Sequence, residues 1–439
     1  MTGKKERGLF ELYQQDPERA DRLVFGRVAH SDRRGFLKGA GLATMGAVLG
    51  AAIPFHRNMP LGLIPEALAQ SDETMLFETK DGLTLLNDRP INAETPAHLL
   101  DDAITPNHRF FVRNNGLVPQ FAIDGDASGW TLTVDGEVDN PLEMSLDDLK
   151  NNFETVSYEL QLECGGNGRS AFNPPARGNQ WTVGAIGNAV WTGVRYADVL
   201  RAAGVKDTAI YTGHYGLDPH LSGDPEKLPL SRGVPLWKAM EPHSLIAFEM
   251  NGEAIPALHG FPVRTVCSGW PGSASQKWLN RIQVRADVHD GPKMGGQSYR
   301  MPAFPVAPGD EVENEDMRIM ESMPVKSIIT SPRSDSTLPL DNRSVEVRGH
   351  AWAGERSVAQ VELSIDFGAT WISTELAPPA NKYAWQTWRQ VIRLPSQGYY
   401  EVWSRATDEA GTQQPFTVGW NPRGYGNNAM HRVSLRVPS

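Results

Sequence analysis

The sequence predicts an α+β domain followed by an all-β, immunoglobulin-like sandwich domain. Between about residues 80 and 320, short strand-like segments alternate irregularly with short helical ones. Beyond Pro324, successive segments alternate apolar and polar residues, which is typical of an antiparallel sandwich. After an N-terminal export segment, residues 1–69, the remaining chain is too long for one typical core. We therefore expect a first domain over residues 70–320 and a second over 321–439.

The elements of the first domain follow from local patterns. Ser145, with Asp147 and Asp148 behind it, is a helix-start signal, and Asn251-Gly252 is a tight hairpin turn. The expected helices are 145–153 and 194–203, and the expected strands are 130–138, 209–212 and 244–250, the last of which enters that turn.

The second domain is predicted from alternation alone. Its expected strands are 344–352, 359–366, 387–394 and 399–406, with Val361, Leu363 and Ile365 pointing inward. The acidic stretch Glu311–Asp316 before it is expected to be a solvated face or a linker. Such a domain often has no chemistry of its own, so its expected role is to pair two subunits into a homodimer.

The N-terminus carries an export signal. Residues 31–38, Ser-Asp-Arg-Arg-Gly-Phe-Leu-Lys, form a twin-arginine motif that a short apolar run and Ala67-Leu68-Ala69, a possible cleavage site, follow. The apolar run is short and rich in Gly and Ala, which argues against a membrane anchor. We expect folded export to the periplasm, removal of residues 1–69 and no membrane span afterwards.

Composition excludes several functions. A net charge of −10 argues against a nucleic-acid partner, which prefers a basic face. The chain has no phosphate-binding P-loop motif and no dinucleotide-binding glycine motif after a strand. It also has no Cys-x-x-Cys-His motif, so no covalent haem is expected.

Cys164 is the most informative residue. It ends an apolar, strand-like stretch and is followed by Gly165-Gly166-Asn167-Gly168-Arg169. Glycines let the backbone approach a bulky group, and a guanidinium favours the thiolate and can hold an anion. This pattern predicts a metal and anion site. The alternative is a structural disulfide with Cys267, the one other cysteine, which otherwise fits a small buried apolar residue.

Three further stretches place cations beside glycine, proline or aromatic residues. Arginine binds oxyanions through paired hydrogen bonds, and glycine-rich turns add backbone N–H donors, so these loops could clamp a phosphorylated cofactor. The stretches are residues 108–115, 259–264 and 269–278.

These motifs resemble the sulfite oxidase family of molybdenum enzymes over nearly the whole mature chain. The matching motifs are FFVRNN at 110–115, ECGGNGR at 163–169, HGFPVR at 259–264, SQKWLNRI at 275–282, and the C-terminal WNPRG at 420–424 with HRV at 431–433. The resemblance implies a molybdenum–molybdopterin cofactor with Cys164 as the protein's metal ligand.

The resemblance also implies the residues of the site. Those expected to bind the cofactor are Arg113, Asn114, Asn115, Cys164, His259, Arg264, Ser275, Gln276 and Lys277. Those expected to act on the substrate are Arg113, Cys164, Arg169, Trp181, Tyr299 and Arg423, the last reaching in from the second domain. Asn115 stands where some members have histidine, Ser275 replaces a basic contact, and Gly168 replaces the first of two arginines. Asp218 is the nearest match to an acidic pterin contact.

The implied reaction is oxidation of sulfite to sulfate at the metal. Because the chain has no haem of its own, single electrons are expected to pass to a soluble c-type cytochrome. Two alternatives remain. The same fold could act on a sulfane sulfur or reduce an S-oxide such as methionine sulfoxide, or the chain could be a non-catalytic exported binding protein with a disulfide.

Overall fold

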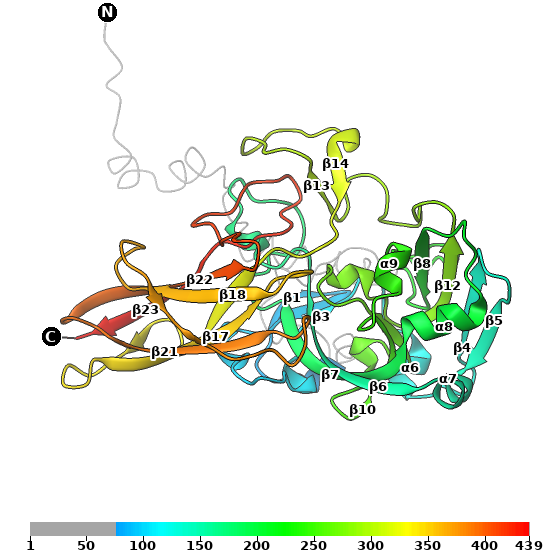
Figure 1. The fold of residues 1–439 in the computed structure, drawn as a ribbon, viewed down its shortest axis with the longest axis horizontal. Coiled ribbons are helices and arrows are strands. Elements are labelled where there is room, and N and C mark those ends of the chain that lie inside the picture. Colours follow the sequence, from blue (N-terminus) through cyan, green and yellow to red (C-terminus); the bar gives the residue numbers. More distant parts are fainter. Residues whose placement is uncertain (1–75, 439) are drawn as a thin grey trace, which may run out of the picture. The chain divides into compact units, whose positions relative to one another are not determined.

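The computed structural model describes residues 76–438, so the expected twin-arginine segment lies outside the described residues. The first domain is mostly β and contains four sheets (Figure 1). These are β1(Thr84–Asp88)-β2(Ile91–Glu94)-β3(Val112–Arg113), β10(Glu253–Ala254)-β9(Leu245–Met250)-β7(Ile186–Arg195)-β6(Thr155–Glu163) with β11(Arg264–Val266) on β9, β5(Leu142–Ser145)-β4(Thr131–Gly136)-β12(Leu279–Arg285)-β8(Tyr211–Gly216), and β13(Arg300–Pro302)-β14(Met317–Ile319).

Its helices are short: α6(Gln120–Asp124), α7(Leu146–Asn152), α8(Tyr196–Ala203) and α9(Leu236–Ala239). The helix expected at 145–153 is confirmed as α7, and Ser145 and Asp148 form a capping box at its start. The turn at Asn251-Gly252 is also confirmed, because Asn251 and Gly252 have φ values of 55° and 81° and join β9 to β10. The α+β fold class is therefore confirmed, with strands dominating.

Two expected boundaries were wrong. The helix expected from residue 194 begins at Tyr196, because Val194 and Arg195 still pair with β9 at the end of β7. The strand expected at 209–212 begins at Tyr211 and continues to Gly216, where it pairs with β12. In both cases the local structure depends on pairing with a strand far away in the sequence, and the local sequence pattern does not indicate that pairing.

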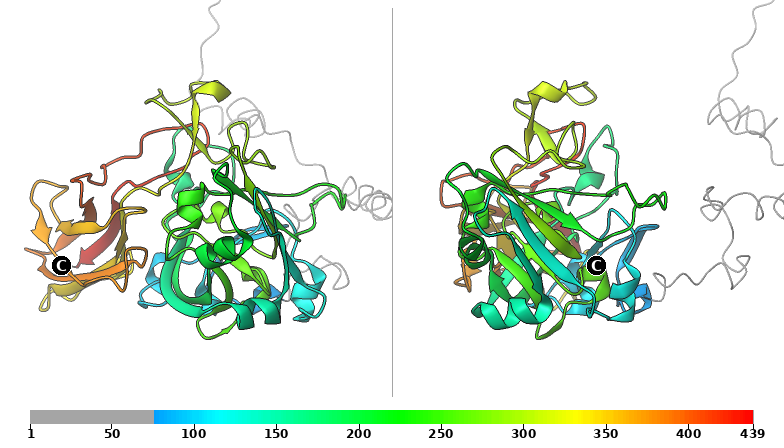
Figure 2. Two further views of the ribbon diagram at one scale, coloured as in Figure 1. Left: turned by 45° about the vertical axis from the view of Figure 1, so that its right-hand side comes forward. Right: turned by 90° about the vertical axis from the view of Figure 1, so that its right-hand side faces the viewer.

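The second domain is a two-sheet sandwich, which confirms the expected class. One sheet is β15(Lys326–Ser331)-β17(Ser344–Trp352)-β21(Gln386–Arg393)-β20(Glu375–Leu376), and the other is β16(Ser336–Thr337)-β23(His431–Val437)-β22(Gly398–Asp408)-β18(Val358–Ser364)-β19(Ile372–Ser373). Val361 and Leu363 are buried between the sheets, and Ile365 packs against the same core while partly exposed. The acidic stretch 311–316 belongs to the connection between β13 and β14, a two-stranded arm at the top of Figure 2.

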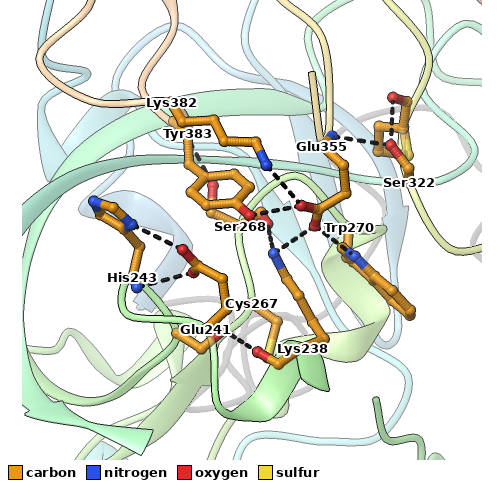
Figure 3. A network of polar contacts seen from close by, with 12 residues as sticks. Lys238, Glu241, His243, Cys267, Ser268, Trp270, Ser322, Glu355, Lys382 and Tyr383 are labelled. Atoms are coloured by element: carbon orange, nitrogen blue, oxygen red, sulfur yellow. Dashed lines mark hydrogen bonds and ion pairs between the residues drawn. The ribbon is translucent and has the colours of Figure 1, made fainter. Parts of the chain in front are cut away.

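A half-buried carboxylate joins the two domains (Figure 3). Glu355, between β17 and β18, accepts hydrogen bonds from Lys238 Nζ at 2.6 Å and Trp270 Nε1 at 2.8 Å of the first domain. Its other oxygen accepts from Tyr383 Oη at 2.6 Å and Lys382 Nζ at 3.2 Å. Burial works to raise the pKa of Glu355, but Lys238 and these hydrogen bonds outweigh it and lower that pKa. The carboxylate is therefore ionised and holds the domains together.

The long loop between β22 and β23 leaves the sandwich and returns to the first domain, as the red trace in Figure 2 shows. Its Asn427 Nδ2 donates to Gly168 O at 2.7 Å, next to the cysteine motif. Within residues 76–438, none of the helices is long and apolar enough to cross a lipid bilayer.

Candidate functional site

Cys164 follows directly on β6, the strand that carries the apolar stretch before it. Its N–H donates to Ala185 O at 2.9 Å, and its carbonyl accepts from Asn167 N at 2.8 Å, so a tight turn follows the thiol. A Cβ on Gly166 would lie 2.3 Å from Arg169 Nη2, and one on Gly168, where φ is 89°, would lie 2.6 Å from Asn427 Nδ2. The glycines are needed because side chains pack directly onto the turn.

The second domain supports this turn through buried Glu163. Glu163 Oε1 accepts from Asn167 Nδ2 at 3.0 Å and from Lys326 Nζ at 3.1 Å. Its Oε2 accepts from Trp352 Nε1 at 2.7 Å. Lys326 and Trp352 belong to β15 and β17, so the sandwich fixes the residues on both sides of Cys164.

The two cysteines are both buried, and their thiols are free. Cys267 belongs to an apolar core, and burial raises its pKa to about 12, so it is the inert, small apolar residue expected. The disulfide alternative is wrong. Cys164 instead lines a cavity.

That cavity brings together most of the residues expected at the site. Its walls come from the loop after β3, the cysteine loop, the loops around β11 and the loop before β13. Its lining includes the expected residues Arg113, Asn115, Cys164, His259, Arg264, Ser275, Gln276, Lys277 and Tyr299, together with Phe110, Phe111, Asp218, Ser273 and Trp278.

Four expected residues, Asn114, Arg169, Trp181 and Arg423, are not among those that line the cavity. Asn114 is buried, and its Oδ1 accepts a hydrogen bond from Lys277 Nζ. Trp181 is buried against Phe111, with ring centroids 6.5 Å apart. Arg169 donates from Nε to Arg423 O at 3.0 Å, so Arg423 of the second domain contacts the cysteine loop through its backbone.

Asn115, which the resemblance places where some family members have histidine, accepts hydrogen bonds from two cationic side chains. Its Oδ1 accepts from Arg113 Nη2 at 2.9 Å and from Lys293 Nζ at 2.7 Å. The amide therefore holds both positive groups at the cavity wall, which is a role that a histidine ring, itself capable of carrying positive charge, fills less well.

The cavity is lined by more basic than acidic groups. Burial lowers the pKa of Lys277 well below its ordinary value, and Arg264 lowers it further. Burial likewise lowers the pKa of Arg264 to about 9. Among the described residues that line the cavity, Asp218 is the one carboxylate, and burial raises its pKa to about 6 against the opposing effect of Lys277. Basic groups buried together at the cost of lowered pKa values fit an anionic ligand, because its negative charge would favour their protonated forms.

Several buried polar atoms of this region have no hydrogen-bond partner among the described residues. They are Asn114 Nδ2, Trp181 Nε1, Asp218 Oδ1, Ser273 Oγ and Gln276 Oε1. Buried polar groups are normally paired, so these atoms fit donors and acceptors of a ligand that is itself polar. Within residues 76–438, no group of three or more His, Cys, Asp or Glu side chains could hold a metal ion. A metal at Cys164 therefore needs further ligands from a cofactor.

Sequence reasoning missed four residues of the site. Lys80 Nζ lies 2.6 Å from Asn107 O and 2.6 Å from His259 Nε2, and burial lowers its pKa to about 7. Lys293 contacts Asn115, as described above, and Arg232 and Tyr425 both pack near Tyr299. Lys293 stands in Gly291-Pro292-Lys293-Met294-Gly295, so the signal used for the other loops could have found it. Lys80 has no local signal.

Two family models match the chain in succession. An oxidoreductase molybdopterin binding domain matches residues 115–293, and a Mo-co oxidoreductase dimerisation domain matches residues 317–438. The first match lies within the expected range 70–320, and the second begins four residues before the expected boundary at 321.

Proteins similar in sequence are named sulfite oxidases. The chain is 34% identical over 363 residues to sulfite oxidase of Gallus gallus, covering 80% of this chain and 77% of that protein. It is 35% identical over 372 residues to mitochondrial sulfite oxidase of Homo sapiens, covering 81% of this chain and 66% of that one. The matched region thus spans about two thirds of the human protein.

A solved structure has the same fold. The sulfane dehydrogenase SoxCD of Paracoccus pantotrophus matches with a TM-score of 0.66 and 23% identity, covering 89% of this chain and 98% of that chain. At that identity the likeness shows the fold alone.

Proposed function

Because the chain belongs to the sulfite oxidase family of molybdopterin-dependent oxidoreductases, we propose that it is a periplasmic sulfite dehydrogenase that reduces a soluble c-type cytochrome. The observation that carries the proposal is the cationic cavity beside Cys164. Sulfite and sulfate are small oxyanions with up to two negative charges. A protein whose net charge is −10 needs such a local excess of cations to bind them.

The residues of the cavity fit the molybdopterin cofactor. Buried Arg264 and Lys277, together with Lys80, which contacts His259, can pair with the negative charge of the cofactor's phosphate. Ser273 and Gln276, whose polar atoms have no partner among the described residues, can form hydrogen bonds with the cofactor's polar groups. Cys164 would be the metal ligand, since molybdenum is soft enough to bind sulfur. His259, Arg264, Ser275, Gln276 and Lys277, with Arg113, Asn114 and Asn115 on the facing loop, would hold the organic part.

The chain's own side chains would bind and orient the substrate. Arg113 and Tyr299 line the cavity. Trp181 packs against the lining residue Phe111, and Arg169 contacts Tyr425, whose ring stacks on Tyr299. At an effective dielectric constant near 20, a guanidinium about 4 Å from a unit negative charge stabilises it by about 4 kcal/mol before desolvation. Burial works to raise the pKa of Tyr299, but Arg113 and Lys293 outweigh it and lower that pKa, so its phenol can donate a proton readily.

The bound cofactor supplies the oxygen atom that sulfite gains and takes up the two electrons that sulfite loses. Sulfite and water yield sulfate, two protons and two electrons, so two molecules of oxidised cytochrome c are consumed for each sulfite. An acidic enzyme and a basic cytochrome attract each other, so the reaction should slow as salt screens their charges. The dimerisation domain supports a homodimer as the assembled form.

The test is turnover of purified, molybdenum-loaded protein with sulfite and oxidised cytochrome c, at low and high ionic strength. Molybdenum content is measured on the same samples, and cofactor-free protein is the control. Turnover proportional to molybdenum content supports the proposal. A fully loaded sample that ignores sulfite but oxidises a sulfane sulfur, or reduces methionine sulfoxide, would replace it with one of those activities.

A further inference from the structure

Four side chains from four separate segments of the chain form a continuous series of ring and guanidinium contacts beside the cavity. Arg232 Cζ lies 4.7 Å from the ring centroid of Tyr299. The rings of Tyr299 and Tyr425 are stacked, with centroids 5.4 Å apart and planes 18° apart. Arg169 Cζ lies 5.0 Å from the Tyr425 ring. We call this series the Arg–Tyr stack. Each of its contacts is of an attractive type.

The backbone of Tyr299 is in a conformation that needs such support. Its φ is 51°, in the left-handed region that a bulky residue rarely adopts. A residue persists there only where its surroundings fix it. One fixed point is its carbonyl, which accepts from Met320 N at 2.9 Å. The others are the side-chain contacts to Arg232 and Tyr425.

Arg232 is a buried cation without a carboxylate partner. It is 1% exposed, and its Nε and Nη2 have no hydrogen-bond partner among the described residues. Within residues 76–438, its guanidinium makes one hydrogen bond, from Nη1 to Lys293 O at 3.4 Å, which is long. A guanidinium so placed interacts mainly with the Tyr299 ring and with negative charge that develops near it.

Tyr425 belongs to the second domain, and the contacts of its loop hold its ring against Tyr299 and Arg169. Asn421 locks the loop, because its Nδ2 donates to Tyr425 O at 2.9 Å and its Oδ1 accepts from Tyr425 N at 3.1 Å. A Cβ on Gly424, where φ is 60°, would lie 2.7 Å from Arg169 Cγ. Gly426 N donates to Gly165 O at 3.0 Å, which ties the loop to the cysteine turn.

We propose that Arg232 and Tyr425 are positioning residues that hold Tyr299 and Arg169 in a fixed relation at the substrate site. The proposal rests on the proposed function, because it assumes that Tyr299 and Arg169 face the oxyanion. Through Tyr425 the second domain then has a part in substrate binding as well as in subunit pairing. Arg232 adds positive charge behind the phenol of Tyr299, where it helps to offset the effect of burial on that group.

The role of Tyr425 is tested with the holoenzyme, at equal molybdenum content, by the variants Tyr425→Leu and Tyr425→Phe. Loss of the ring in Tyr425→Leu is expected to raise KM for sulfite by about 2- to 10-fold, the range that a stacked aromatic pair supplies, with kcat changed less than KM. Tyr425→Phe keeps the ring and should show a smaller rise. The matched control is Tyr399→Leu, which alters an exposed tyrosine of the same domain. An unchanged KM in Tyr425→Leu, or equal rises in both variants, would overturn the proposal.

The role of Arg232 is tested without turnover, so the result stands even if sulfite is not the substrate. The phenol of Tyr299 is titrated by ultraviolet difference spectroscopy, using Tyr299→Phe in each background to isolate its signal. In Arg232→Met its pKa should rise by up to about one pH unit, because Arg232 is a weaker influence on that pKa than Arg113 and Lys293. Arg232→Lys, which keeps the charge, should leave the pKa low and still raise KM. A titration that is the same in Arg232→Met and the wild type would refute the role.

Discussion

The replacement Asp218→Asn tests the charge balance of the cavity directly. Asp218 is 6% exposed, and its Oδ1 has no hydrogen-bond partner among the described residues. Burial raises its pKa from 3.8 to about 6, although Lys277 and Lys293 act in the opposite direction. Asparagine has nearly the same shape and keeps one acceptor oxygen, so the change removes the charge and little else.

The sign and size of the effect follow from that pKa. Because the native carboxyl binds its proton more tightly than the unfolded one, its contribution to stability is full below pH 3.8 and is lost as the pH rises through about 6. A rise of about two pH units corresponds to about 3 kcal/mol at 1.36 kcal/mol per unit. The cofactor-free Asp218→Asn protein should therefore match the wild type near pH 4 and be more stable by about 3 kcal/mol at pH 7.5.

The assay is urea unfolding of the cofactor-free wild type and variant at pH 4.5, 6 and 7.5. Asp207→Asn, at an exposed aspartate, is the matched control and should show no such trend. Cofactor binding should respond in the opposite direction, because an acceptor that the ligand would use has been weakened, so molybdenum content after equal loading should fall. A stability difference that does not change with pH would refute the reasoning, since it would mean that Asp218 carries no buried charge.

Three further predictions follow from the site and the domain interface. Cys164→Ser should lower both molybdenum content and sulfite turnover by about 100-fold or more, because the metal loses its protein ligand, and a variant that keeps its molybdenum would disprove the assignment. Trp181→Phe removes the unpartnered indole N–H together with part of a fully buried ring, and should raise KM for sulfite by about 5-fold, the value of one hydrogen bond, while lowering stability by about 1 to 3 kcal/mol through the cavity it leaves; an unchanged KM would show that the indole only packs. Glu355→Gln leaves Lys238, 1% exposed, without its counter-charge and should lower the free energy of unfolding by about 3 kcal/mol near pH 7. Because the pKa of Glu355 is lowered in the native state, the wild-type advantage should fade as the pH drops below about 4.5, and a constant advantage in a pH series of melts would contradict this account.

Local sequence patterns predicted those parts of the fold that depend on interactions between residues close together in the sequence. The capping box at Ser145, the turn at Asn251-Gly252 and the alternation in 344–352 all depend on neighbouring residues, and all three are confirmed. The start of α8 and the extent of β8 depend on pairing with β9 and β12. Those partners lie far away in the sequence, so no nearby residue could have indicated them.

The motifs around Cys164, His259 and Lys277 were visible in the sequence because each places unusual side chains on glycine-rich loops. The structure brings these loops to one cavity, as expected. Lys80, Arg232 and Tyr425 were not anticipated. Arg232 stands beside Gly233, and Tyr425 stands between two glycines, so both have a local signal that Lys80 lacks. The importance of all three comes from what folding places next to them.

By itself, the sequence determined the two-domain fold class, the cysteine that faces the cavity, and the family with its molybdopterin cofactor, because those features are written in short, contiguous stretches. Only the tertiary structure decided how charge is balanced in the cavity and how the second domain supports the cysteine turn. Burial and pairing set both, through Asp218 among the buried cations and through Glu163 between Lys326 and Trp352. Neither can be read from a linear chain, because the free energy of a charge depends on everything that folding packs around it.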